Sequence, residues 1–155
     1  MAAERTNVSN DLIWQLTRNQ NAYLVRRNAG GGSQLSRDPL NLVNKHSFKY
    51  AGYTNNKAIG VHGNEEGGVT VITKKPGSSQ QPAKAEVKVN YGPKTATRKI
   101  YKGVADLTAK NGYRADLREE AVARVSAIRR SQKPKKETPA PKLRGAKARK
   151  AEQEE

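Results

Sequence analysis

The side chains that could act as bases near neutral pH are two histidines, His46 and His62. Both lie in segments whose composition predicts a strand or a turn, where a single histidine more often has a structural role than a catalytic one. Glu65 and Glu66 are neighbours in a glycine-rich turn, a setting typical of solvated carboxylates. The chain has 0 cysteines, which excludes disulfides, thiol catalysis and cysteine zinc sites. The sequence therefore predicts no enzyme activity, no catalytic residues, no metal, no cofactor and no small-molecule substrate.

Cations dominate the chemistry that the sequence offers. Lys and Arg number 30 against 14 for Asp and Glu, which gives a formal net charge of +16. A small body with this surplus would repel itself unless a polyanion neutralised it, and nucleic acid is the natural counter-charge. No apolar run approaches the roughly 18 residues of a membrane span, and residues 1–10 lack the hydrophobic region of a secretory signal. We expect a nucleic-acid partner, no membrane, and a location in the cytosol or nucleus.

Basic residues recur in every segment instead of concentrating in one helix. Mixed Lys and Arg on many sides suit phosphate contacts to folded RNA better than readout of a DNA groove. Arginine adds planar stacking and bidentate phosphate contacts, whereas lysine adds a point charge. The residues predicted to bind RNA are Arg26, Arg27, Lys45, Lys49, Lys74, Lys75, Lys94, Arg98, Lys99, Lys102, Arg114, Arg118, Arg124, Arg129, Arg130, Lys133, Lys135 and Lys136.

The aromatic residues each have two possible roles. The single Trp, Trp14, is predicted to pack on the body of the protein, with stacking on RNA as the less favoured role. Tyr50, Tyr53 and Tyr113 lie near basic residues and could stack on unpaired bases, although burial is favoured for Tyr50.

Short elements are predicted in the N-terminal half. Apolar residues at helical spacing predict a helix over residues 10–18, capped by Asn10 or Asp11. Residues 22–27 are typical of a strand that enters a glycine loop. Residues 46–53 alternate as an extended segment would.

The middle of the chain predicts a mainly antiparallel sheet with one covered face. Residues 59–61 and 69–75 are rich in β-branched side chains and flank the turn-forming residues 63–68, which indicates a hairpin. Residues 84–90 alternate strictly, which predicts a half-buried strand with these residues inward: Ala85, Val87 and Val89.

Beyond Gly92-Pro93 the period changes from two to about 3.6, which predicts two amphipathic helices. The apolar stripe of the first is Ala96, Ile100, Val104 and Leu107. Asn111-Gly112 is a helix stop, and a second helix follows over residues 115–130. Its inward residues are predicted to be Leu117, Ala121, Val125 and Ile128, with Arg114, Arg118 and Arg129 along one flank.

From Lys133 the apolar signal ends, so this segment cannot bury enough surface to offset its ordering entropy. The fold class is therefore α+β: a small mainly antiparallel sheet with a short N-terminal helix, two C-terminal amphipathic helices and a disordered basic tail. The predicted domains are a body over residues 1–132 and a tail over residues 133–155, which would order between RNA helices.

Several stretches of the sequence resemble one known family. They are DLIWQLTRNQNAYLVRRN, then NKHSFKYAG with KAIGVHG and GGVTVITKK, and finally YRADLREEAVARVSAIRRSQKP, in this order between residues 11 and 134. Together they resemble the eukaryotic large-subunit ribosomal proteins of the L28e family. The glycines at residues 30–32, the pair Glu119-Glu120 and the tail after Pro134 depart from the family pattern.

The resemblance implies a small α+β body on the solvent side of the large (60S) ribosomal subunit. Its partners would be ribosomal RNA and neighbouring ribosomal proteins, it would support cytoplasmic translation, and it would have no catalytic residues. It would act in the cytoplasm after transit through the nucleus and nucleolus during assembly.

Two alternatives stay open. A ribosome-biogenesis factor of the Mak16-like type has a related domain, but it is expected to carry cysteine zinc ligands and a long acidic extension that this chain lacks. A basic chromatin protein of linker-histone type is the other, although such tails prefer lysine, whereas arginines are interleaved here.

Overall fold

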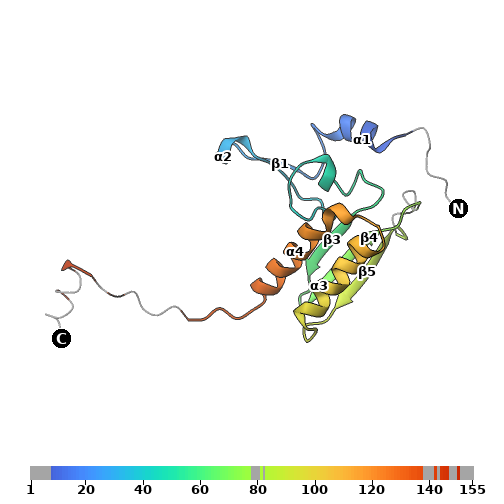
Figure 1. The fold of residues 1–155 in the computed structure, drawn as a ribbon. Helices are drawn as coiled ribbons and strands as arrows, with labels where there is room; N and C mark the ends of the chain where they lie inside the picture. Colours follow the sequence, from blue (N-terminus) through green and yellow to red (C-terminus); the bar gives the residue numbers. More distant parts are fainter. Residues whose placement is uncertain are drawn as a thin grey trace.

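The computed structural model describes residues 8–77, 81, 83–137, 142, 144–146 and 150. Within them, helices combine with two small antiparallel sheets, which confirms the predicted α+β class. Figure 1 shows α3 (Thr97–Ala105) and α4 (Arg118–Ser131) side by side over a three-stranded sheet, with the N-terminal elements gathered at one end of this body. Among the described residues, no helix is long and apolar enough to cross a membrane.

The sheet consists of β3 (Ile59–Gly63), β4 (Val69–Lys74) and β5 (Glu86–Tyr91), in that order. β3 and β4 pair antiparallel with Val61 opposite Val71, so the predicted hairpin is confirmed. Because side chains alternate along a strand, the β-branched residues form one apolar row on the helix side. Its central members, Ile59, Val61, Val69 and Val71, are at most 2% exposed.

The strand predicted over residues 84–90 is confirmed as β5, but it is less buried than its alternation suggested. Ala85 is buried just ahead of the strand, Val89 is half-buried, and Val87 is 38% exposed. The reason is position: β5 pairs only with β4 in this sheet, and α4 packs over β3 and β4.

The first amphipathic helix, α3, runs on into a π-helical turn, η2 (Asp106–Lys110). Ile100 and Val104 are fully buried as predicted, but Ala96 is wrong because it is the exposed N-cap residue. The π turn inserts an extra residue into the helical repeat, so Thr108 takes the fully buried place that a regular helix would give to Leu107. Leu107 packs against the core but is only partly buried.

The second helix begins three residues later than predicted. A 3-10 turn, η3 (Ala115–Leu117), precedes α4. The predicted inward residues are confirmed, since Leu117, Ala121 and Val125 are at most 3% exposed and Ile128 packs on the core. Arg114 lies ahead of the helix and points toward the body, so it does not share a helix flank with Arg118 and Arg129.

The N-terminal helix is confirmed as α1 (Asn10–Thr17), but its cap is Ser9, which precedes both predicted caps. The Ser9 Oγ accepts a hydrogen bond from the Leu12 N–H at 3.1 Å. Trp14 packs on the body as predicted, with its ring centroid 4.9 Å from that of His46 and 5.8 Å from that of Phe48.

The strand predicted over residues 22–27 is confirmed, and the glycine loop that follows it belongs to a second hairpin that was not predicted. β1 (Leu24–Arg26) pairs antiparallel with β2 (Gln34–Ser36), and the short turn α2 (Ala29–Gly32) joins them. The extended segment predicted over residues 46–53 is wrong: it contains a 3-10 turn, η1 (Phe48–Tyr50). Its aromatic residues face separate neighbours around that turn instead of one strand face.

Loop residues from the N-terminal half cover the sheet face opposite the helices. The His62 Nε2–H donates to the Pro39 carbonyl at 2.7 Å, beside Gly60, where a Cβ would lie 2.6 Å from the same oxygen. Buried Asp38 holds this loop, because its carboxylate accepts from the N–H groups of Leu40 at 2.9 Å and Tyr53 at 3.0 Å. This loop is therefore attached to the sheet by the hydrogen bond from His62 of β3 to the Pro39 carbonyl.

The predicted disordered tail lies largely outside the described residues. Of its first part, residues 134–137 are exposed and form no helix or strand. Figure 1 shows this segment leaving the body from the end of α4.

Candidate nucleic-acid interface

The largest group of predicted RNA-binding residues lies where the N-terminal end of α3 meets the C-terminal end of α4. The two helices run antiparallel. The Arg129 guanidinium, near the end of α4, donates a hydrogen bond to the Pro93 carbonyl, just before α3, at 3.2 Å. We call this group the helix-end cluster. Its members at the two helix ends are Lys94, Arg98, Arg130 and Lys133, and Lys135 and Lys136 follow them in the exposed segment that leaves the body (Figure 1).

All members of the helix-end cluster are exposed, and none has a side-chain hydrogen bond or ion pair among the residues that the structure describes. Like charges gathered without counter-charges repel one another, which disfavours this arrangement in water. An anionic partner removes that cost and can bind several side chains at once.

Other predicted residues lie outward on separate elements. Lys99 and Lys102 are exposed on α3, and Arg118 is exposed at the start of α4. Arg124 is half-buried on α4, while Lys75 follows β4 and is exposed. Within the described part of the chain, none of these has a side-chain partner.

A second basic region lies on the hairpin of β1 and β2. Arg26 and Arg27 are exposed at the end of β1, and Lys45 is joined to β2 by an isolated bridge to Leu35. The Arg26 guanidinium donates to the Asn19 carbonyl at 2.6 Å, while Arg27 and Lys45 have no side-chain partner among the described residues.

Two of the predicted residues, Lys49 and Arg114, form ion pairs with carboxylates of the same chain. The Lys49 ammonium lies 2.8 Å from the Glu120 carboxylate, which also accepts from the Tyr50 hydroxyl at 2.9 Å. These contacts raise the pKa of Lys49 and lower the pKa of Glu120. The pair joins η1 to α4, and its lysine is already neutralised.

Arg114 is the most connected cation of the set. Its guanidinium lies 2.7 Å from the Asp116 carboxylate and donates to the carbonyls of Lys49 and Lys57, both at 2.9 Å. The hydrogen bonds from Arg114 lower the pKa of Asp116. With 16% of its side chain exposed, Arg114 fixes three segments and offers little surface to RNA.

Lys74 and Arg129 also serve the protein itself. The Lys74 ammonium donates to the carbonyls of Gly52 at 3.3 Å and Asn55 at 3.0 Å, and desolvation lowers its pKa. Arg129 donates to Gln132 and Pro93, both at 3.2 Å. Of the predicted set, these two side chains together with Lys49 and Arg114 have mainly structural contacts.

The tyrosines considered for base stacking are engaged elsewhere. The Tyr50 hydroxyl binds Glu120, and the Tyr113 hydroxyl binds the backbone of Ala58 and Lys74. Tyr53 packs between Trp14 and Tyr23. Its ring centroid lies 6.4 Å from that of Trp14 and 5.9 Å from that of Tyr23. Desolvation raises the pKa of Tyr113.

Both histidines have structural partners, as predicted. The His46 Nε2–H donates to the Arg18 carbonyl and that of His62 to the Pro39 carbonyl, each at 2.7 Å. In the described ranges, no group of three His, Asp or Glu side chains could hold a metal ion.

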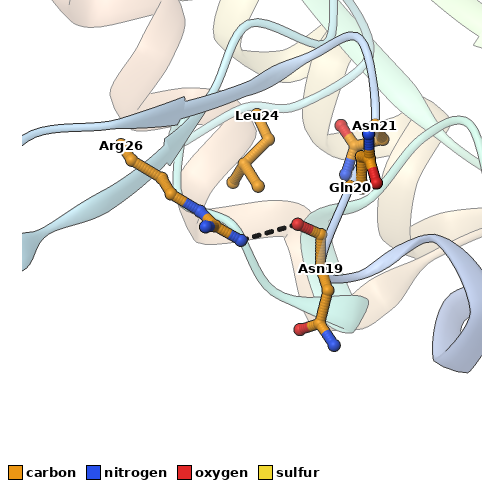
Figure 2. Close-up of a pocket in the computed structure, with 5 residues that line it drawn as sticks. All are labelled: Asn19, Gln20, Asn21, Leu24 and Arg26. Atoms are coloured by element: carbon orange, nitrogen blue, oxygen red, sulfur yellow. Dashed lines mark hydrogen bonds between the residues drawn. The ribbon is translucent and has the colours of Figure 1, made fainter.

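Sequence reasoning missed an open pocket at the junction of α1 and β1, shown in Figure 2. Its volume is about 440 Å³, and it is lined by Asn19, Gln20, Asn21, Leu24 and Arg26. Arg26 was predicted from its charge alone, whereas the neutral amides carried no signal in the sequence. Only the return of β1 alongside the end of α1 brings these residues together.

Comparisons with known proteins agree on one family. The family model described as the ribosomal L28e protein family matches residues 12–131. The chain is 45% identical over 131 residues to "Large ribosomal subunit protein eL28" of Schizosaccharomyces pombe, covering 84% of this chain and 97% of that protein. Proteins of the same name match from Dictyostelium discoideum, at 32% identity over 130 residues (81% and 93% covered), and from Caenorhabditis elegans, at 34% over 127 residues (81% and 91% covered).

Proposed function

This chain belongs to the ribosomal L28e protein family, and from that membership we propose that it is a structural constituent of the large ribosomal subunit. The observation that carries the proposal is the match of residues 12–131, which spans the described body from α1 to the end of α4. In this role the protein is not an enzyme. It supports cytoplasmic translation as part of the ribosome, after passing through the nucleus and nucleolus during assembly.

Within the subunit, the protein binds ribosomal RNA through distributed phosphate contacts. Support comes from the predicted cations that have no side-chain partner among the described residues, including the helix-end cluster. They lie at the end of β1, on α3 and α4, and at the start of the tail, so more than one RNA segment can contact them. A protein held among several RNA segments and neighbouring ribosomal proteins fits this distribution.

Sedimentation of cell extract tests the proposal. The protein should co-migrate with 60S subunits and translating polysomes, and RNase should release it whereas DNase should not. Confinement to nucleolar precursor particles would instead support a biogenesis factor. Release by DNase alone would support a chromatin protein, and either result would overturn the proposal.

A further inference from the structure

The pocket at the junction of α1 and β1 is held open by contacts of its own residues. The Asn21 side chain donates to the Thr17 carbonyl at 3.1 Å and accepts from the Tyr23 N–H at 3.0 Å, so it fixes the turn between the two elements. The Arg26 guanidinium is anchored across the pocket by its 2.6 Å hydrogen bond to the Asn19 carbonyl, marked in Figure 2. These three hydrogen bonds shape the pocket before any ligand enters.

Two polar side chains of the pocket, those of Gln20 and Arg26, have groups available to a ligand, while Figure 2 shows the Asn19 carboxamide, which also has no partner among the described residues, pointing away from Leu24 and Arg26. The Gln20 carboxamide has no hydrogen-bond partner among the described residues, and the Arg26 guanidinium uses one N–H on Asn19. A carboxamide presents a donor and an acceptor side by side, which matches the edge of a nucleobase. A planar guanidinium can stack on the face of a base and bind its phosphate.

The other walls fit the same ligand. Leu24 is half-buried, and Figure 2 shows its side chain between Arg26 and the amides of Gln20 and Asn21, where it offers an apolar surface to a base. No acidic residue lines the pocket, so a phosphate meets no like charge there. The pocket is open to solvent, so a base can enter it from outside without a rearrangement of the chain.

We propose that this pocket receives one unpaired nucleotide of RNA, with its base stacked on Arg26 and its edge bound by Gln20. The inference rests on the proposed function, because it names the RNA element that this part of the protein takes. It also separates the hairpin from the helix-end cluster: the hairpin pocket reads a base, whereas the cluster contacts phosphates alone.

The test uses the full chain and two single-stranded oligoribonucleotides of equal length, one with all bases and one with abasic positions. The wild-type protein should bind the base-containing strand more tightly. Gln20→Ala and Arg26→Lys should each reduce this preference by about tenfold, as expected for losing a base-edge contact or a stacking partner. Arg26→Lys keeps the charge, so the salt dependence of binding should not change.

Matched controls lie on the same hairpin. Gln34 is opposite Arg26 in the strand register, is exposed, and does not line the pocket, and Arg27 is the adjacent cation. Gln34→Ala and Arg27→Lys should leave the base preference unchanged. Thermal unfolding checks that each variant is folded: Gln20→Ala has no side-chain partner among the described residues to lose, whereas Arg26→Lys loses the hydrogen bond to Asn19, so the base preference of Gln20→Ala is the deciding result.

Photo-crosslinking of the assembled ribonucleoprotein gives a second measurement. A nucleotide crosslinked within residues 19–26 supports the inference. Crosslinks from these residues to a neighbouring protein, or equal base preference in wild type and Gln20→Ala, would overturn it while leaving RNA binding elsewhere intact. Absence of all RNA binding would overturn the proposed function as well.

Discussion

At the scale of single residues, side chains of equal charge have different roles in this protein. Arg114 and Arg118 are only four positions apart and look alike in the sequence. The Arg114 guanidinium binds the Asp116 carboxylate and two backbone carbonyls. Arg118, in contrast, is exposed and has no side-chain partner in the described part of the chain. The first stabilises the fold and the second is available to RNA.

Substitution of these two arginines tests the separation. Arg114→Ala should lower the free energy of unfolding by about 1.5–3 kcal/mol, because it removes charge-assisted hydrogen bonds and leaves carbonyls unsatisfied. Arg118→Ala should change it by less than about 0.5 kcal/mol and weaken RNA binding. Urea unfolding and RNA titration measure the two effects. Equal stability loss in both variants would contradict the assignment.

Asp116 should make stability depend on acid pH. Its hydrogen bonds to Arg114 lower its pKa in the folded state below the unfolded value. The resulting stabilisation is therefore fully present above the unfolded pKa, about 3.9, and is lost as pH falls through the folded value. Because 46% of the Asp116 side chain is exposed, solvent screening limits the effect to about 1 kcal/mol or less.

The measurement is urea unfolding of wild type and Asp116→Asn between pH 7 and pH 2. The variant should be less stable by a constant amount above about pH 5, and the difference should vanish at the acid end. When both proteins also carry Arg114→Ala, the difference in their free energies of unfolding should hardly change with pH. A difference that persists at pH 2 would show that the pair is not its source.

Residue roles were the least predictable part of the site. Charge marked all eighteen candidate residues equally. The sequence holds no sign that Lys74 lies under two loop carbonyls or that Glu120 reaches Lys49, because these partners are brought together by tertiary packing. Gln20 was missed for another reason: a neutral amide carries no charge signal, and the pocket that it lines forms only where the chain turns between α1 and β1.

At the scale of elements, Gln132 joins α4 to the β3–β4 turn. Its carboxamide donates to the Gly68 carbonyl at 2.7 Å and accepts from the Gly68 N–H at 3.2 Å, and Gly68 is buried. This contact also fixes the place from which the tail leaves the body.

Gln132→Ala should lower the free energy of unfolding by about 1–3 kcal/mol, because it leaves a buried N–H and a carbonyl with weaker partners. Hydrogen exchange should quicken in the last turn of α4 and at the turn around Gly68. The exposed neighbour Lys133→Ala is the control and should change neither. Uniform quickening across the sheet would indicate global unfolding instead of a local clamp.

Elements with a clear period were predicted well, whereas short ones were predicted unevenly: β1 was expected, but β2 and η1 were not. The β3–β4 hairpin, β5, α3 and α4 each have enough residues for alternation or a 3.6-residue stripe to stand out. β2 has three residues, and η1 is a turn formed by residues of strand composition, with Phe48 packed on Trp14. The π turn shifted the stripe of α3 at Thr108, a local change that no period can reveal.

At the scale of the whole molecule, the net charge of +16 requires that binding depend on salt. Each phosphate contact releases counterions and contributes about −0.7 to −0.9 to the slope of log affinity against log salt. The slope therefore counts contacts, and the predicted tail residues Lys133, Lys135 and Lys136 should supply some of them.

Truncation after Gln132 tests that contribution. The body should stay folded with nearly unchanged stability, because residues 133–137 are exposed and the core residues all precede them. The truncated protein should bind RNA with a shallower salt slope and incorporate less well into subunits, since each lost phosphate contact removes about one unit of slope at most. The Gln20 base preference should survive the truncation, because the pocket lies at the other end of the chain. An unchanged slope would mean that the tail cations do not touch RNA, and the phosphate contacts would then have to come from the helices and the β1–β2 hairpin alone.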